Sequence, residues 1–118
     1  MTRILLVEDE LLVRELAFED LSDEGFEVSA AGTGEDALAL LREDGGFDLL
    51  LTDIRLPGAI DGWRLAEEGK RLIPGLKVIY ATGLADDEGR LGSEDRFLKK
   101  PYRKETMLRH VEELGLSA

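Results

Sequence analysis

Short runs of apolar residues alternate with longer amphipathic stretches along the 118-residue chain. Three of these runs, residues 4–7, 48–52 and 77–82, are almost continuously apolar rather than alternating. Continuous hydrophobicity is what a parallel strand buried on both faces requires. Residues 27–30 and 96–98 form weaker runs, and we expect them to be flanking strands.

The stretches between the runs carry the pattern of helices. Thr33 and Asp36 resemble a capping box that opens a second helix. Asp61 could cap the third helix, which Pro74 must end. In the first helical stretch, residues 10–24, apolar side chains recur at spacings of three and four. They predict a buried stripe of Val13, Leu16, Ala17 and Leu21.

The last two helical stretches differ in strength. Residues 84–95 contain two glycines and few apolar anchors, and each interior Gly costs a helix about 1 kcal/mol relative to Ala. We therefore expect a fourth helix that is short or frayed, and mobile. The final helix, at about residues 103–114, is expected to bury Met107, Leu108, Val111 and Leu114. Five βα units predict one open parallel sheet with helices on both faces.

Composition indicates a single soluble domain covering residues 1–118. The length suits one domain, and a hydrophobic fraction of 43% is ordinary for a globular protein. The absence of cysteine excludes a disulfide framework and a thiolate zinc site, and suits a reducing cytoplasm. The first apolar run ends at Val7, before Glu8, and is too short for a signal peptide or a membrane span. We therefore expect a cytoplasmic protein that does not enter the membrane.

The charge is strongly negative and uneven. A formal net charge of −11 argues against direct binding of nucleic acid, because phosphate would be repelled. Residues 96–109 nevertheless carry six basic side chains against Glu105 alone, a net of +5. This segment could meet an acidic partner or a phosphate, but a solvated helix face is the simpler explanation.

Polar residues stand where the predicted strands end: Glu8 and Asp9, Asp53, Thr82 and Lys100. Ligands of such sheets bind beyond the carboxyl ends of the strands, so we expect these groups to converge at one rim. Clustered carboxylates repel one another, and Mg²⁺ relieves that repulsion with oxygen ligands. A carboxylate held against Mg²⁺ can attack a phosphoryl group and form an acyl phosphate. Lys100 would neutralise the added charge, and the Thr82 hydroxyl could donate a hydrogen bond to it.

These residues together resemble the receiver domain of response regulators in two-component signalling. The resemblance covers the whole chain in order: Glu8 and Asp9, then Asp53, then residues 80–83, then residues 99–102. It implies a flavodoxin-like doubly wound α/β fold with strand order 2-1-3-4-5. It also implies a phosphoprotein of a phosphorelay.

The resemblance assigns a role to each site residue. Asp53 would be the phosphoacceptor, and Asp9 and Asp53 would be direct Mg²⁺ ligands. The backbone carbonyl of Arg55 would also coordinate the metal, and Glu8 would act mainly through water. Lys100 would neutralise the charge added by the phosphoryl group.

The resemblance further implies a switch and its partners. Thr82 would sense the phosphoryl group, and Phe97 falls where the family carries a rotating aromatic, although core packing explains Phe97 equally well. The bond between Lys100 and Pro101 is expected to be cis, which costs little before proline. The donor would be a sensor histidine kinase or a histidine phosphotransfer protein, and the target a downstream protein. A homodimer through the fourth helix, fifth strand and fifth helix is left open.

Some features depart from the family pattern. Residues 80–83 and the end of the fifth strand resemble the FAT GUY subgroup of receivers, but Tyr80 replaces its Phe and Leu84 follows the glycine. The loop of residues 57–62 is one residue longer than usual. Arg103 stands where the final helix usually carries a capping side chain. These departures leave the surface geometry open and do not touch the phosphorylation chemistry.

Several of these residues also have simpler explanations. Glu8 and Asp9 could merely cap the first helix, and Asp53 alone could be a turn residue. His110, the lone histidine, is expected at the surface rather than as a phosphohistidine, and Trp63 is expected to be structural.

Leu11 and Phe18 lie seven residues apart on one flank of the first helix, outside its predicted stripe. Partial burial against the last helix would explain them. The alternative is docking onto the helical bundle of a kinase, a site that the family often forms with its first helix.

Rival functions fit the same residues less well or stay open. An aspartyl phosphotransferase or phosphatase of another fold would need an Asp-x-Asp pair, and Arg55 two residues after Asp53 counts against it. A pseudo-receiver that only binds proteins is disfavoured by the complete site. A phosphate sink, or a receiver excised from a hybrid histidine kinase or larger regulator, stays open. Because its substrate is its own side chain, we expect a self-phosphorylating and self-dephosphorylating module, not a turnover enzyme.

Overall fold

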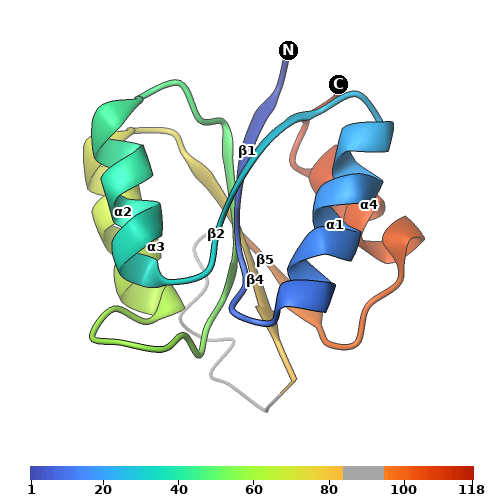
Figure 1. Ribbon diagram of the computed structural model, residues 1–118. Coiled ribbons are helices and arrows are strands. Elements are labelled where there is room, and N and C mark those ends of the chain that lie inside the picture. Colours follow the sequence, from blue (N-terminus) through green and yellow to red (C-terminus); the bar gives the residue numbers. More distant parts are fainter. Residues whose placement is uncertain (84–94) are drawn as a thin grey trace.

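The computed structural model describes residues 1–83 and 95–118, which form one five-stranded parallel sheet in the order β2-β1-β3-β4-β5 (Figure 1). The strands are β1 (Arg3–Val7), β2 (Glu27–Ala31), β3 (Leu49–Asp53), β4 (Lys77–Thr82) and β5 (Asp95–Lys99). The predicted doubly wound fold and its strand order are confirmed. The fourth helix expected within residues 84–95 falls, except for Asp95, outside the described residues.

Four helices are described: α1 (Leu11–Asp23), α2 (Gly34–Glu43), α3 (Gly62–Leu72) and α4 (Lys104–Glu113). Helices α2 and α3 cover one face of the sheet, and α1 and α4 cover the other (Figure 1). Both termini lie at the end of the sheet opposite the carboxyl ends of the strands (Figure 1). Within the part of the chain that the structure describes, no helix has the length and apolarity needed to cross a bilayer.

The central strands separate two hydrophobic clusters, which explains their continuous apolar runs. Alternate side chains of β1, β3 and β4 point to opposite faces, and a helical layer covers each face. The cluster beneath α2 and α3 includes Leu5, Val7, Leu50, Val78 and Tyr80. The cluster beneath α1 and α4 includes Ile4, Leu6, Leu49, Leu51 and Ile79.

The stripe predicted for α1 is wrong at Leu16, which is 64% exposed. Ala17 and Leu21 are buried and set the face of the helix that meets the sheet. Leu16 precedes Ala17 by about 100° around the helix axis, so it turns outward. A spacing pattern alone does not fix which edge of a broad apolar stripe faces the core.

The helix boundaries follow the predicted caps. Thr33 Oγ1 accepts a hydrogen bond from the Asp36 N–H at 3.0 Å, and Asp61 Oδ1 accepts one from the Arg64 N–H at 2.8 Å. Helix α4 begins after Arg103, whose side chain makes no capping bond to the described residues.

Lys70 of α3 and Asp95 of β5 form a part-buried ion pair. Lys70 Nζ lies 2.9 Å from both carboxylate oxygens of Asp95, whose side chain is 2% exposed. The pair joins α3 to an edge strand that pairs only with β4 among the described strands.

Replacing Lys70 with Met will lower the free energy of unfolding by about 2 kcal/mol, because it removes the ammonium from a buried carboxylate. Lys70 is itself part-exposed, which keeps the loss below that of a fully buried pair. Urea denaturation of Lys70→Met measures the effect. Arg71→Met is the matched control, because Arg71 pairs with Glu68 at the surface and its loss is expected to cost about 0.5 kcal/mol or less. Equal losses in the two variants would contradict the prediction.

Candidate functional site

The sheet register brings the ends of β1, β3 and β4 together. Val7 pairs with Thr52, so Glu8 and Asp53 follow at the same level of neighbouring strands. Asp53 in turn pairs with Ala81, which places it beside Thr82 at the end of β4. The parallel arrangement thus gathers at one rim residues that lie far apart in the sequence.

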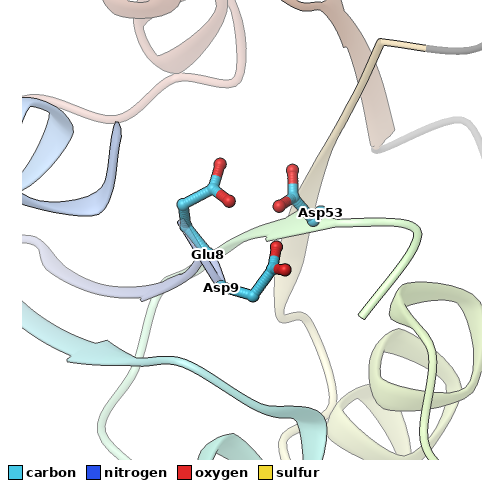
Figure 2. A group of neighbouring side chains, drawn as sticks. All are labelled: Glu8, Asp9 and Asp53. Atoms are coloured by element: carbon cyan, nitrogen blue, oxygen red, sulfur yellow. The ribbon is translucent and has the colours of Figure 1, made fainter. Parts of the chain in front are cut away.

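Three carboxylates cluster at this rim (Figure 2). Ligand oxygens of Glu8, Asp9 and Asp53 all lie within 4.8 Å of one another. Glu8 and Asp53 are buried, and Asp9 is exposed to solvent. Clustered oxygen donors with one open side suit Mg²⁺, which favours carboxylate oxygens and keeps several of its waters.

Lys100 neutralises part of the negative charge of this cluster. Its Nζ lies 2.6 Å from Glu8 Oε1 and 3.0 Å from Asp53 Oδ1. Lys100 directly follows β5, and its backbone is held against the end of β4, because the Lys100 N–H donates to the Thr82 carbonyl at 2.8 Å. The peptide bond between Lys100 and Pro101 is cis.

Burial and mutual contact shift the titration of the cluster. Burial, followed by the hydrogen bond to Glu8, raises the pKa of Asp53 to about 8. Burial opposes ionisation of Glu8 as well, but hydrogen bonds with Asp53 and Lys100 leave its pKa below the ordinary value. Burial also acts against the charge of Lys100, yet its two carboxylate partners raise its pKa. Without metal, the carboxylate pair therefore holds a proton more tightly than an isolated aspartate.

The remaining predicted residues lie around this centre. Thr82 is buried at the end of β4. Phe97 pairs in register with Tyr80 and packs at the border of the cluster beneath α2 and α3. Arg55 is exposed on the loop that leaves Asp53. Lys99 is also exposed, so Lys100 is the lysine that enters the site.

Trp63 was expected to be structural, and His110 was expected at the surface. Trp63 packs against Tyr80 with their ring centroids 4.4 Å apart. His110 is half-buried on α4, with Nδ1 3.4 Å from Glu113 Oε1.

Sequence reasoning missed two supports of the site. Arg14 of α1 donates from Nη1 to the Glu8 carbonyl at 2.8 Å. Glu35 of α2 accepts through Oε2 a hydrogen bond from the Ala59 N–H at 3.0 Å, in the loop between β3 and α3. Arg14 follows Glu8 by only six residues and lies near the start of α1, so its sequence position was a signal that could have found it. Nothing in the sequence links Glu35 to a loop 24 residues away.

Comparison with known proteins gives one consistent result. The family model described as "Response regulator receiver domain" matches residues 4–112. The receiver protein CpdR of Brucella abortus is 31% identical over the full length of both chains. The sensor kinase CckA of the same organism is 33% identical over 94% of this chain but only 12% of its own length.

Solved structures agree with these relatives. A response regulator receiver protein from Sinorhizobium medicae superposes with a TM-score of 0.89 at 29% identity, covering 96% of this chain and 93% of its own. The receiver domain of the hybrid histidine kinase CckA has a TM-score of 0.82 at 35% identity, covering 95% and 97%. The likeness to the FAT GUY subgroup stays a prediction. The chain belongs to the response regulator receiver domain family of two-component systems.

Proposed function

We propose that this receiver accepts a phosphoryl group on Asp53, in the presence of Mg²⁺, from a phosphohistidine of a sensor kinase or phosphotransfer protein in the cytoplasm. The observation that carries the proposal is the convergence of Glu8, Asp9 and Asp53 with the Lys100 ammonium at one rim. A buried carboxylate beside further carboxylates and an ammonium is suited to receiving a phosphoryl group when a divalent cation balances the charge.

The transfer is a displacement at phosphorus. An oxygen of Asp53 forms a bond to phosphorus while the P–N bond of the donor imidazole breaks, and the bonding electrons leave with the imidazole. Lys100 offsets negative charge on the phosphoryl oxygens, and the Thr82 hydroxyl donates a hydrogen bond to one of them. Later hydrolysis returns Asp53 and inorganic phosphate, so the domain modifies and restores its own side chain.

The metal would be held by oxygen atoms of this chain. Asp9 and Asp53 would coordinate it directly, the carbonyl of Arg55 would add a third ligand, and Glu8 would act through water. When bound, Mg²⁺ supplies positive charge against the phosphoryl oxygens and lowers the repulsion among the carboxylates.

Incubation with acetyl phosphate and MgCl₂, followed by intact mass, tests the proposal. The protein should gain the mass of one phosphoryl group, and fragmentation should locate it on Asp53. Excess EDTA should prevent the gain. A gain that is unaffected by EDTA, or that maps to another residue, would end the proposal.

Phosphorylation would be read by protein partners. It adds up to about two negative charges beside Thr82 and Lys100, and the β5 and α4 surface would respond through Phe97. A downstream protein or a second copy of the chain would bind that altered surface. The likeness to the CckA receiver favours, as a second candidate, the same chemistry within a larger hybrid kinase.

The outer surface of α1 is the proposed contact for the phosphoryl donor. Leu11 is 56% exposed and Phe18 is 40% exposed, so both offer apolar surface to a partner. Helix α1 begins at Leu11, two residues after Asp9, so a helical partner on this surface would stand beside the phosphorylation site.

The double variant Leu11→Asp, Phe18→Asp should slow transfer from the phosphorylated kinase at least about tenfold, because it places charge in an apolar contact. Phosphorylation by acetyl phosphate should remain unchanged, since the site itself is untouched. Leu72→Asp is the control, because Leu72 is a similarly exposed apolar residue at the end of α3. Normal kinase transfer to the double variant would exclude this surface.

A further inference from the structure

The loop between β3 and α3 is held closely at its base. The Ile54 N–H donates to the Ala81 carbonyl at 3.1 Å, and the Gly62 N–H donates to the Ile54 carbonyl at 2.7 Å. The two ends of the segment 55–61 therefore lie side by side next to Asp53. Arg55, whose carbonyl is a proposed metal ligand, is the first residue of this excursion.

The far end of the same loop rests on the first turn of α2. The Ala59 N–H donates to Glu35 Oε2 at 3.0 Å. Gly58 has φ +90°, and a Cβ there would lie 2.8 Å from both Glu35 carboxylate oxygens. At Gly34, a Cβ would lie only 2.5 Å from the Ile60 carbonyl oxygen, so helix and loop backbones are in direct contact.

We infer that Glu35 is a positioning residue for the metal site: by fixing the tip of the loop at Ala59, it sets the position of the Arg55 carbonyl. The inference rests on the proposed function. A loop that is fixed at its base and at its tip has fewer conformations to lose when Mg²⁺ binds. Such preorganisation raises the affinity for the metal. The excursion of residues 55–61 is thus restrained by a contact from a neighbouring helix.

Two pairs of variants separate the positioning of the loop by Glu35 from the effects of losing a charge or of placing alanine at a positive φ. Glu35→Ala removes the acceptor, and Asp36→Ala removes the same charge from the same exposed helical turn without touching the loop. Gly58→Ala displaces the tip from Glu35. Gly75→Ala introduces alanine at a nearly identical φ of +92° where no atom lies within 4 Å of the new Cβ.

The experiment is a titration of each full-length protein with MgCl₂, followed through backbone amide chemical shifts. Glu35→Ala and Gly58→Ala should weaken Mg²⁺ binding by about three- to tenfold, the range expected for losing one charge-assisted hydrogen bond at the surface. Asp36→Ala and Gly75→Ala should stay within about twofold of wild type. Glu35→Gln keeps an amide oxygen that can accept from Ala59 and should restore most of the affinity.

The outcomes distinguish this inference from the proposed function. If wild type binds Mg²⁺ and Glu35→Ala binds it equally well, Glu35 positions nothing and the proposed function stands. If Glu35→Ala and Asp36→Ala weaken binding equally, the effect is one of charge and the inference fails. If wild type binds no Mg²⁺ at all, the proposed function fails first.

Discussion

Asp53→Asn will show no phosphoryl adduct after incubation with acetyl phosphate and MgCl₂, and it will melt at a higher temperature than wild type in metal-free buffer. The first effect follows because an amide cannot form the acyl phosphate. The second follows because Asp53 is only 5% exposed and its carboxyl group contacts Glu8. A neutral amide removes the cost of holding a second buried charge there.

The stability gain of Asp53→Asn should depend on pH. The pKa of Asp53 is raised from 3.8 to about 8 by burial and then by Glu8. A raised pKa means that the unfolded chain releases this proton first, so wild-type stability falls as pH increases between about 4 and about 8. The advantage of the variant should therefore be small near pH 4 and full near pH 8.

Thermal unfolding in EDTA across this pH range provides the measurement. We expect a gain of at least about 4 °C at pH 8, corresponding to about 1 kcal/mol for a domain of this size. Adding MgCl₂ should stabilise wild type and have little effect on the variant. A variant that melts below wild type at pH 8 would show that the bond from Lys100 to Asp53 outweighs the burial of the carboxylate.

Gly62→Ala will destabilise the protein by about 3 kcal/mol or more, the upper range for forcing extra atoms into a packed site. A Cβ at Gly62 would lie 2.1 Å from the Asp53 carbonyl oxygen and 2.7 Å from the Ile54 Cα. Both are backbone atoms at the end of β3 and the start of the following loop, so they cannot rotate aside as a side chain would. Helix propensity alone would favour Ala over Gly by about 1 kcal/mol. A lower free energy of unfolding in the variant can therefore be attributed to the steric contact.

Gly69→Ala in the same helix is the matched control. Its Cβ would lie 3.0 Å from Leu76 Cδ2 and 3.3 Å from Leu41 Cδ1, which are ends of flexible side chains. We expect its free energy of unfolding to change by about 1 kcal/mol or less. Urea denaturation measures the free energy of unfolding of both variants. Similar losses in the two would contradict the prediction, because they would mean that the backbone near Gly62 can move to admit a Cβ.

The sequence predicted the sheet well because its signal is local. Three continuous apolar runs marked the buried strands, and the polar residue after each run marked its carboxyl end. Parallel topology alone then placed Glu8, Asp9 and Asp53 at one rim.

Other features depended on the placement of one element against another. Helix α1 meets the sheet through Ala17 and Leu21 rather than Leu16, which its spacing did not determine. Strand β5 begins at Asp95, one residue earlier than expected. A buried charge at that position needs Lys70, a partner 25 residues away. The rotation of a helix about its axis and the pairing of distant charges depend on tertiary packing, which a local sequence pattern does not contain.

The contact between Lys100 and Glu8 spans 92 positions of the chain. Chains emerge from the ribosome amino end first, so the acceptor aspartate is made long before the ammonium that balances it. A nascent polypeptide lacking its final strand carries the crowded acids without that cation. The phosphorylation site is therefore complete only after β5 and Lys100 have been synthesised and have paired with the earlier strands.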